Sequence, residues 1–321
     1  VSLESRRINP LKRRPVDTPL NVGVKAINGL ITVGKGQRIG LMAGSGVGKS
    51  VLLGMMCKNT EADVIVIGLI GERGREVREF IENNLTPEAR EKAIIIAAPA
   101  DESPLMRLKA TLLCHRVAEY FRDRGKDVLL MMDSLTRYAM AQREIALSLG
   151  EPPATRGYPP SVFNLLPQLL ERAGNAENPQ GSLTAIYTIL AVSDDQQDPV
   201  VDSARAILDG HIVLSRHLAE QGHYPAIDIS ASISRCMGTC VETPHITLAS
   251  EFRRHYSAYL QVKDLIPLGG YQPGQDPELD RSVGLYPILS EYLKQPQNSS
   301  VNYHESLVEL ANVFKVNEPR L

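Results

Sequence analysis

Residues 38–50 read RIGLMAGSGVGKS, and this stretch decides the fold. The apolar run 38–43 has the length and continuity of a buried strand, and a helical pattern starts at Gly48. Glycines between a strand and a helix leave backbone N–H groups free to converge on phosphate oxygens. The N-terminus of the helix adds a partial positive charge. The segment therefore predicts a phosphate-binding P-loop.

Two side chains of this P-loop are expected to contact a nucleoside triphosphate and its metal. Lys49 should reach the β- and γ-phosphates, and the Ser50 hydroxyl should bind Mg²⁺. Ala43 replaces the first glycine of the motif, at a position that ends the strand. A glycine-rich turn without a ligand is the alternative interpretation. The nucleotide-binding residues that we predict are Gly44, Ser45, Gly46, Val47, Gly48, Lys49, Ser50 and Val51.

Apolar runs and helical patterns alternate along most of the chain. Further strands are expected at 63–70, 93–98, 127–132, 182–192 and 210–215. Continuous apolar strands that alternate with helices are typical of an α/β fold, in which helices cover both faces of a mostly parallel sheet.

The pattern changes after about residue 245. Leu248, Phe252 and Tyr256 repeat at helical spacing, as do Leu307 and Leu310. We therefore predict three parts, which are an extended lead-in (1–20), a P-loop domain (21–245) and a small helical domain (246–321).

Composition excludes several classes of protein. The 321 residues are 43% hydrophobic and 22% charged with a net charge of −2, so a sizeable core can form. The near-neutral charge and the aromatic content of 5% argue against nucleic-acid binding. No apolar run reaches the roughly 18 residues that a membrane span needs. The four cysteines are too few for a disulfide scaffold, and Cys236 and Cys240 lack the second pair that a zinc site requires.

Two acidic residues stand where strands near the P-loop are expected to end. Asp133 can reach a water on Mg²⁺ from the C-terminal edge of the sheet, although it could instead cap the helix that follows. Glu72 can orient and polarise the water that attacks the γ-phosphate. Its alternative is an ordinary loop position.

Four stretches together resemble the catalytic subunits of the rotary and export ATPase superfamily. They are GSGVGKS, GERGREV, LLMMDSLTRYAMAQRE and YPAIDISASIS, and the resemblance covers nearly all of residues 20–321. It implies a RecA-like P-loop domain followed by a helical domain. The stretches LIGERGREVREFIE and EPPATRGYPPSVFNLLPQLLERAG are most similar to flagellum-specific type III protein export ATPases. Val51 favours this branch over the injectisome type III ATPases, which are the close second.

The resemblance implies roles for single residues. Lys49 and Ser50 match the ligands of the nucleotide and Mg²⁺, and Asp133 matches the acid at the end of the Mg²⁺ strand. Glu72 matches the water-activating glutamate, and Arg73 matches a neighbouring arginine that contacts the site.

Further matches fall in two later segments. In HYPAIDISASISR (223–235), which shows neither helical spacing nor a clean strand alternation, Tyr224 matches an aromatic residue that stacks on adenine. Arg235 matches an arginine finger that is supplied to the adjacent subunit. A core tyrosine and an intrachain ion pair are the respective alternatives. The stretch SDDQQDP (193–199) matches a loop that faces a central stalk, or is a solvated acidic turn.

The function implied by the resemblance is Mg²⁺-dependent ATP hydrolysis at the interfaces of a homohexameric ring, which energises flagellar protein export. The implied partners are a central coiled-coil stalk protein, a peripheral stator or regulator, chaperone–substrate complexes and an export gate. The implied location is the cytoplasm, at the inner-membrane export apparatus.

Three other functions remain as alternatives, which are a virulence injectisome ATPase, a rotary ATPase nucleotide-binding subunit and an RNA translocase ring. Non-catalytic subunits tend to lose the glutamate that this chain has at Glu72. Nothing before residue 20 could form the family's N-terminal β-barrel, so we expect a piece of a longer catalytic chain, whose own oligomerisation stays open.

Overall fold

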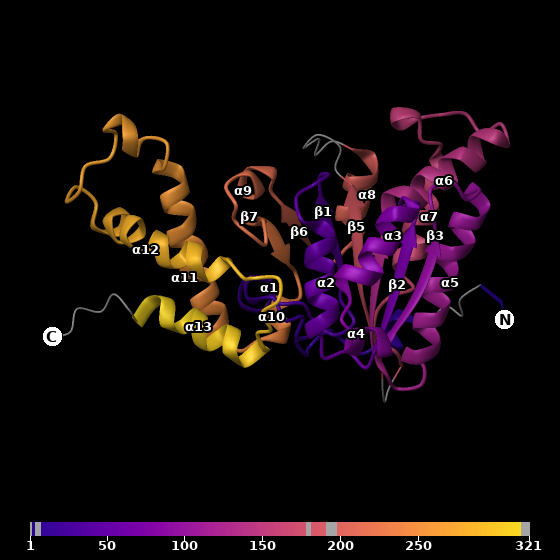
Figure 1. Cartoon of the computed structure of the whole chain (residues 1–321), viewed down its shortest axis with the longest axis horizontal. Helices are drawn as coiled ribbons and strands as arrows, with labels where there is room; N and C mark the ends of the chain where they lie inside the picture. Colours follow the sequence, from indigo (N-terminus) through magenta and orange to yellow (C-terminus); the bar gives the residue numbers. More distant parts are fainter. Residues whose placement is uncertain (1, 4–7, 178–180, 191–197, 316–321) are drawn as a thin grey trace.

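The computed structural model describes residues 2–3, 8–177, 181–190 and 198–315. In this part of the chain, seven strands form one sheet in the order β3-β2-β4-β5-β1-β6-β7 (Figure 1). All neighbouring strands run parallel except β7, which is antiparallel to β6 at the sheet edge. The predicted mostly parallel α/β fold is confirmed. The strands are β1 (Arg38–Ala43), β2 (Val64–Ile70), β3 (Ala93–Ala98), β4 (Asp127–Asp133), β5 (Ser182–Leu190), β6 (Gly210–Leu214) and β7 (Ile227–Ser234).

Helices cover both faces of the sheet, which explains why most of its parallel strands are apolar without alternation. In β2, Ile65 and Ile67 belong to one apolar core, whereas Val66 belongs to the core on the other face. The first core includes α2 (Lys49–Asn59) and the second includes α5 (Pro104–Arg122), α6 (Leu135–Ser148) and α7 (Pro160–Leu170). The other helices of this region are α1 (Lys25–Leu30), α3 (Gly74–Glu79), α4 (Pro87–Glu91), α8 (Pro199–Ile207), α9 (Arg216–Glu220) and α10 (Met237–Cys240), and a π-helix spans Phe80–Asn84.

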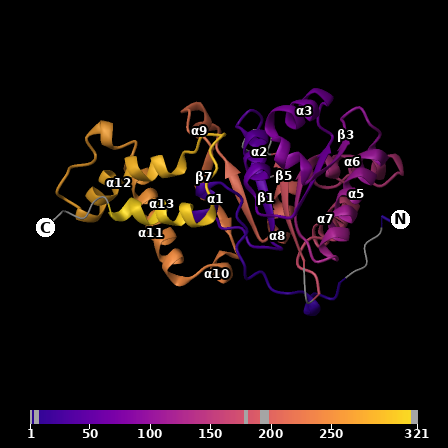
Figure 2. The same ribbon diagram turned by 60° about the horizontal axis from the view of Figure 1, so that its bottom comes forward.

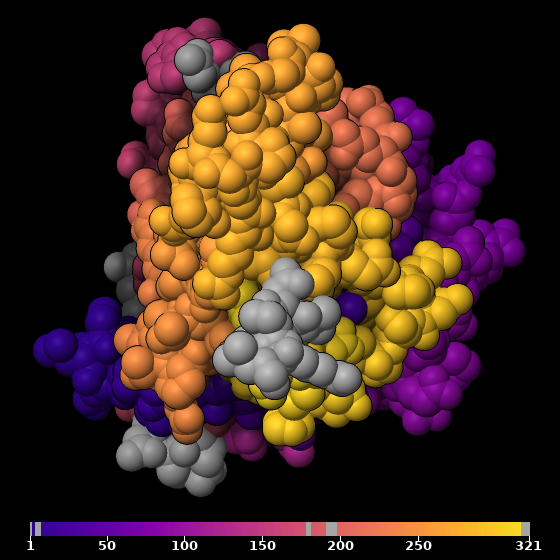
Figure 3. Space-filling view, turned by 90° about the vertical axis from the view of Figure 1, so that its left-hand side faces the viewer, coloured from indigo at the N-terminus to yellow at the C-terminus, as the bar shows by residue number. Residues whose placement is uncertain are grey.

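Three helices follow the sheet, namely α11 (Thr243–Val262), α12 (Pro277–Leu293) and α13 (Tyr303–Lys315). They lie beside α1 and β7 and form the face of the molecule away from β3 (Figures 2 and 3). Phe252, Leu289 and Leu310 share one apolar core with Ile27 of α1. The helical end of the chain is thus as predicted. The division after residue 245 stays a prediction, because α11 already begins at Thr243 and the core crosses it.

Strand β7 is an element that the sequence pattern does not predict. Its pairing with β6 changes register between His211 and Val213, so the alternation of buried and exposed residues is broken. At this irregularity the Asp228 carboxylate accepts a hydrogen bond from the Ala231 N–H at 3.0 Å. Residues 227–234 of the stretch 223–235 therefore form a bulged edge strand.

Two further sequence observations can be compared with the structure. Of the acidic stretch 193–199, residues 193–197 lie outside the described residues, while Asp198 caps α8 and accepts from the Val200 N–H at 2.8 Å. No helix in the described ranges combines the length and the apolar character needed to cross a membrane.

Candidate active site

The P-loop joins the C-terminal end of β1 to the N-terminus of α2. Gly46 and Gly48 adopt φ angles of 79° and 90°, a backbone conformation that favours glycine. No atom lies within 4 Å of the position that a Cβ on Gly46 would take, so the space beside the loop is open. Val47 is buried and anchors the loop, while Ser45 and Ser50 are exposed. The predicted loop therefore has an open side and a helix N-terminus for an anion.

Lys49, Glu72 and Asp133 meet at the carboxyl edge of the sheet. The Lys49 ammonium donates to Oδ1 of Asp133 at 2.6 Å and lies 3.8 Å from Oε1 of Glu72. Glu72 and Asp133 follow or end β2 and β4, which are adjacent strands of the sheet, so the topology brings them together. The three side chains are only 6–13% exposed. The structure thus gathers three of the residues singled out from sequence.

Glu72 carries the most perturbed carboxyl group of this cluster. Burial and the negative charge of Asp133 raise the pKa of Glu72 to about 7, although the Lys49 charge acts in the opposite direction. Its buried Oε1 has no hydrogen-bond partner. A carboxyl group whose pKa lies near neutrality is suited to take up or release a proton.

Two residues that sequence reasoning missed complete this cluster. Thr188 of β5 is buried, and its hydroxyl donates to Oδ1 of Asp133 at 2.6 Å. Arg137 of α6 has a buried Nε without a hydrogen-bond partner, and its side chain lies against Gly71, next to Glu72. No local motif marks either residue. Only their positions on β5 and α6 near the end of β4 could have identified them.

The structure does not bring two other predicted residues into the cluster. Arg73 is at the N-cap of α3, its side chain is 85% exposed, and its guanidinium lies 3.9 Å from Glu76. Tyr224 is 47% exposed, and its ring lies about 3.5 Å from where a Cβ on Gly48 would be. The Tyr224 carbonyl accepts from the Gln295 N–H at 3.0 Å, which ties it to the segment after α12. Tyr224 therefore borders the P-loop with one face available.

Arg235 lies at the amino ends of the parallel strands, opposite the P-loop, which lies at their carboxyl ends. It follows β7, whose last residue Ser234 pairs with Gly210, the first residue of β6. Tyr224 precedes the opposite end of β7, so eight strand residues, roughly 25 Å, separate the two. The exposed Arg235 guanidinium donates to the Arg205 carbonyl at 3.3 Å, and it pairs with no carboxylate in the described ranges. It is thus far from the P-loop of its own chain.

Two family models match the chain. The ATP synthase alpha/beta family, nucleotide-binding domain, matches residues 23–234. The chain belongs to the ATP synthase alpha/beta family. The T3SS EscN ATPase C-terminal domain matches residues 241–312. Membership of the ATP synthase alpha/beta family identifies an ATPase nucleotide-binding domain, and confirms the superfamily and the enzyme class predicted from the sequence.

Individual members of the ATP synthase alpha/beta family are also similar. The flagellum-specific ATP synthase of Pseudomonas aeruginosa is 59% identical over 314 residues, which are 98% of this chain and 70% of that protein. The flagellum-specific ATP synthase of Salmonella typhimurium is 59% identical over 306 residues, 95% of this chain and 67% of that protein.

Solved structures of type III secretion ATPases have the same fold. The assembled ATPase EscN from enteropathogenic E. coli superposes with a TM-score of 0.93 at 49% identity, covering 97% of this chain and 75% of EscN. EscN in complex with its central stalk EscO superposes with a TM-score of 0.91 at 48% identity, covering 98% and 75% of the two chains.

Proposed function

We propose that this chain hydrolyses ATP by direct attack of water, and that the hydrolysis energises protein export by a bacterial flagellar type III apparatus. The observation that carries the proposal is the cluster of Lys49, Glu72 and Asp133 beside an open P-loop at the carboxyl edge of the sheet. This edge is where α/β sheets bind ligands. The P-loop amides and Lys49 bind the phosphates, and the exposed face of Tyr224 takes the adenine.

In this mechanism Glu72 is the group that activates water. Its Oε1, which has no hydrogen-bond partner, can accept a hydrogen bond from a water positioned in line with the γ-phosphate. Lys49 lies between the two carboxylates. A bound γ-phosphate competes with the two carboxylates for the Lys49 ammonium. When Lys49 turns toward the phosphate, Glu72 loses part of the positive charge that offsets its own, and it becomes a stronger base. Arg137, which lies against Gly71, and Arg73, whose side chain is exposed outside this cluster, are the cations proposed to offset charge on the phosphate in the transition state.

The residues also fit a magnesium ion. Ser50 is exposed at the first turn of α2, and Asp133 is held by Thr188, so a hydroxyl and a carboxylate are available as the oxygen ligands that Mg²⁺ prefers. Bound Mg²⁺ would neutralise charge on the phosphate oxygens. Within the chain, Thr188 and Lys49 determine the orientation of the Asp133 carboxylate.

Arg235 is proposed to act on the nucleotide of an adjacent copy. The P-loop and Arg235 occupy opposite edges of the same sheet, which suits a head-to-tail ring in which one copy's P-loop edge faces the next copy's Arg235. An arginine supplied in this way contributes on the order of 10³–10⁵ to the rate of phosphoryl transfer.

The flagellar assignment is supported by the relatives. The chain is 59% identical to two flagellum-specific ATP synthases and 49% identical to EscN. We propose a homohexamer around a central coiled-coil stalk protein, at the cytoplasmic side of the inner-membrane export apparatus. A stator or regulator, export chaperones with their substrates, and the export gate are its other proposed partners.

The substitution Glu72→Gln tests the chemistry. It keeps the shape of the side chain and removes the base, so ATP hydrolysis should fall at least about 100-fold while binding of a fluorescent ATP analogue persists. Glu79→Gln is the matched control, because Glu79 lies on the exposed surface of α3 in an ion pair with Arg75. If Glu72→Gln hydrolyses ATP as fast as the Glu79→Gln control, Glu72 is not the base.

A further inference from the structure

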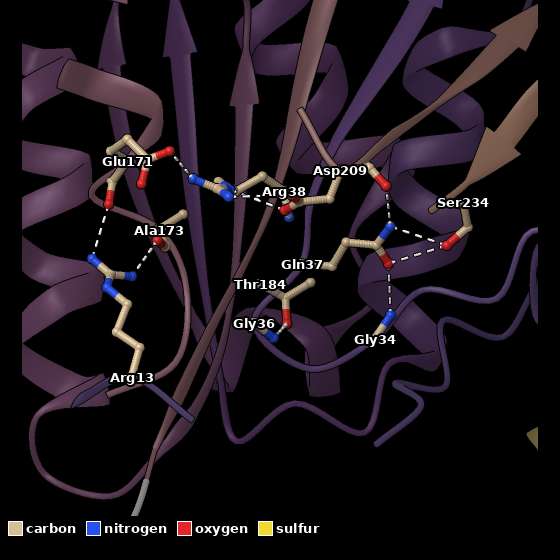
Figure 4. Close-up of polar contacts among 10 residues, drawn as sticks. All are labelled: Arg13, Gly34, Gly36, Gln37, Arg38, Glu171, Ala173, Thr184, Asp209 and Ser234. Atoms are coloured by element: carbon tan, nitrogen blue, oxygen red, sulfur yellow. Dashed lines mark hydrogen bonds and ion pairs between the residues drawn. The ribbon is translucent and has the colours of Figure 1, made fainter. Parts of the chain in front are cut away.

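A polar cluster lies at the amino edge of the sheet, on the side away from the P-loop (Figure 4). We define the base cluster as Gln37, Arg38, Asp209 and Ser234. Its members come from the starts of β1 and β6 and from the end of β7. In Figure 4, Arg38 lies between Glu171 and Asp209, and Gln37 bridges Asp209 and Ser234.

Asp209 is fixed through its carboxylate. The Arg38 guanidinium donates to both oxygens of Asp209, at 3.0 and 3.2 Å, and the Arg38 backbone N–H donates to Oδ2 at 3.0 Å. A second carboxylate, from Glu171, pairs with the other side of Arg38. Although burial opposes its charge, these hydrogen bonds and negative charges raise the pKa of Arg38. Such a bidentate, partly buried pair defines the orientation of Asp209.

Asp209 in turn fixes the backbone of Arg235. The Asp209 carbonyl accepts from the Arg235 N–H at 2.9 Å and from the Gln37 side-chain amide at 2.9 Å. Gln37 is fully buried, and its amide also donates to the Ser234 hydroxyl at 3.0 Å. The residue before Arg235 and the peptide of Arg235 are therefore both held by the base cluster.

The side chain of Arg235 itself is exposed and, among the residues that the structure describes, makes one hydrogen bond, to the Arg205 carbonyl. A long exposed side chain has many accessible rotamers, so its direction depends on how firmly its backbone is held. Catalytic groups must be held near their productive geometry by such supporting contacts, because displacements of about 1 Å cost about 100-fold in rate.

We propose that Arg38, Asp209 and Gln37 are positioning residues that aim Arg235 at the phosphate bound by the adjacent copy. This inference rests on the proposed function, since it requires Arg235 to act between copies. None of the three touches the nucleotide site of its own chain. They act only through the backbone of Arg235.

Mixing of two inactive variants in the full assembled protein tests the proposal. Lys49→Ala subunits lack the phosphate ligand but supply Arg235, and Arg235→Ala subunits supply an intact P-loop. Their mixture should recover activity at interfaces that combine the two intact parts. This reference mixture tests the proposed function alone. Absence of any recovery would show that Arg235 does not act between copies.

Asp209→Asn is then added to either partner. In the Lys49→Ala subunit, Asp209→Asn should reduce the recovered activity at least about tenfold, because the Arg235 side chain that this subunit supplies is misaligned. In the Arg235→Ala subunit it should leave recovery at the reference level, since only the P-loop of that subunit is used. A general folding defect would lower both mixtures. Equal effects in the two partners, or no effect in either, would overturn the positioning role.

Matched variants complete the series. Arg38→Gln should behave as Asp209→Asn does, and Arg38→Lys should restore part of the recovery because it keeps a charge but only one donor group. If Asp209→Asn fails to fold, Gln37→Met replaces it in the same two mixtures. This variant keeps the side-chain length, and it should also reduce recovery only in the Lys49→Ala subunit. Arg13→Gln is the control, because Arg13 donates to the Ala173 and Glu171 carbonyls but does not contact Asp209 (Figure 4). It should recover at the reference level in both partners.

Discussion

The carboxyl group of Glu72, the proposed base, is held in an unfavourable environment. Glu72 is 12% exposed, its Oε1 lacks a hydrogen-bond partner, and Asp133 places a second negative charge nearby. Lys49 offsets only part of this, since its ammonium lies closer to Asp133 than to Glu72. A buried group of this kind lowers the stability of the folded chain when it is ionised, and such sites are common where proton transfer takes place.

This strain predicts a pH-dependent gain in stability from Glu72→Gln. Because the pKa of Glu72 rises from 4.5 to about 7 on folding, the folded chain keeps a proton that the unfolded chain loses within this range. The contribution of Glu72 to the stability of the unmodified chain therefore falls as pH rises from 4.5 to 7, whereas glutamine does not titrate. The variant should be more stable by about 1–3 kcal/mol at pH 8, with a smaller gain at pH 5.

Urea unfolding of the nucleotide-free protein at the two pH values measures this gain. Glu79→Gln, on the exposed face of α3, should show no such gain. A stability difference for Glu72→Gln that is the same at pH 5 and pH 8 would contradict the raised pKa.

At the residue scale, the sequence indicates those site residues that belong to local patterns. Lys49 and Ser50 stand in a glycine-rich loop, and Asp133 ends an apolar strand, so their neighbours in the chain identify them. Thr188 and Arg137 have no such context. They join the site because β5 and α6 lie beside the end of β4, and this is a property of the tertiary structure. The sequence also does not show that the Arg73 side chain is exposed, because this depends on the backbone conformation at the start of α3.

At the scale of elements, the predictable strands are those with a continuous apolar sequence, both the buried β1 and β4 and the partly exposed edge strand β3. Their continuous apolar runs at 38–43, 93–98 and 127–132 coincide with β1, β3 and nearly all of β4. Strand β7 changes register against β6, so its pattern of buried and exposed residues is mixed. Helix α12 is also hard to recognise, because Gly284 and Pro287 interrupt it and both residue types disfavour helix interiors. Tertiary packing overrides this local preference.

That packing predicts opposite effects for two glycine-to-alanine changes. A Cβ on Gly29 of α1 would lie 2.1 Å from the Tyr292 hydroxyl, which donates to the Lys25 and Ser306 carbonyls. Gly29→Ala should therefore cost about 2–4 kcal/mol through overpacking and lost hydrogen bonds. Gly284→Ala in α12 meets no atom within 4 Å and should raise stability by about 0.5–1 kcal/mol.

Thermal or urea unfolding of both variants provides the measurement. Adding Tyr292→Phe to Gly29→Ala removes the clashing oxygen, so the double variant should lose less than the sum of the two single variants. Strict additivity would show that Gly29 and Tyr292 are not coupled, and that α1 and α12 do not pack as described.

At the scale of the whole molecule, the two groups that we propose to act in one reaction lie at opposite ends of the sheet strands. The P-loop cluster lies at the carboxyl edge, and Arg235 lies at the amino edge beyond β7. Figure 1 shows α9 and α10, which flank β7 in the chain, at opposite ends of the sheet. A single copy therefore cannot bring its own Arg235 to its own P-loop without unfolding the edge strand. Two copies in head-to-tail contact can combine the two edges, and a closed ring repeats this contact at every interface.

This arrangement predicts ATPase activity that depends on protein concentration. Specific activity should rise as copies associate, because each contact supplies an arginine worth on the order of 10³–10⁵ in rate. Arg235→Ala should abolish the rise yet leave nucleotide binding by the isolated chain unchanged, since Arg235 is roughly 25 Å of strand away from Tyr224.

Steady-state hydrolysis across a dilution series, with the oligomeric state followed by sedimentation, measures both effects. Lys12→Gln is a control, because Lys12 forms an exposed ion pair with Glu177 and lies outside the proposed site. Full activity in monomers that still depends on Arg235 would refute a finger acting between copies, since the fold gives Arg235 no route to its own phosphate site.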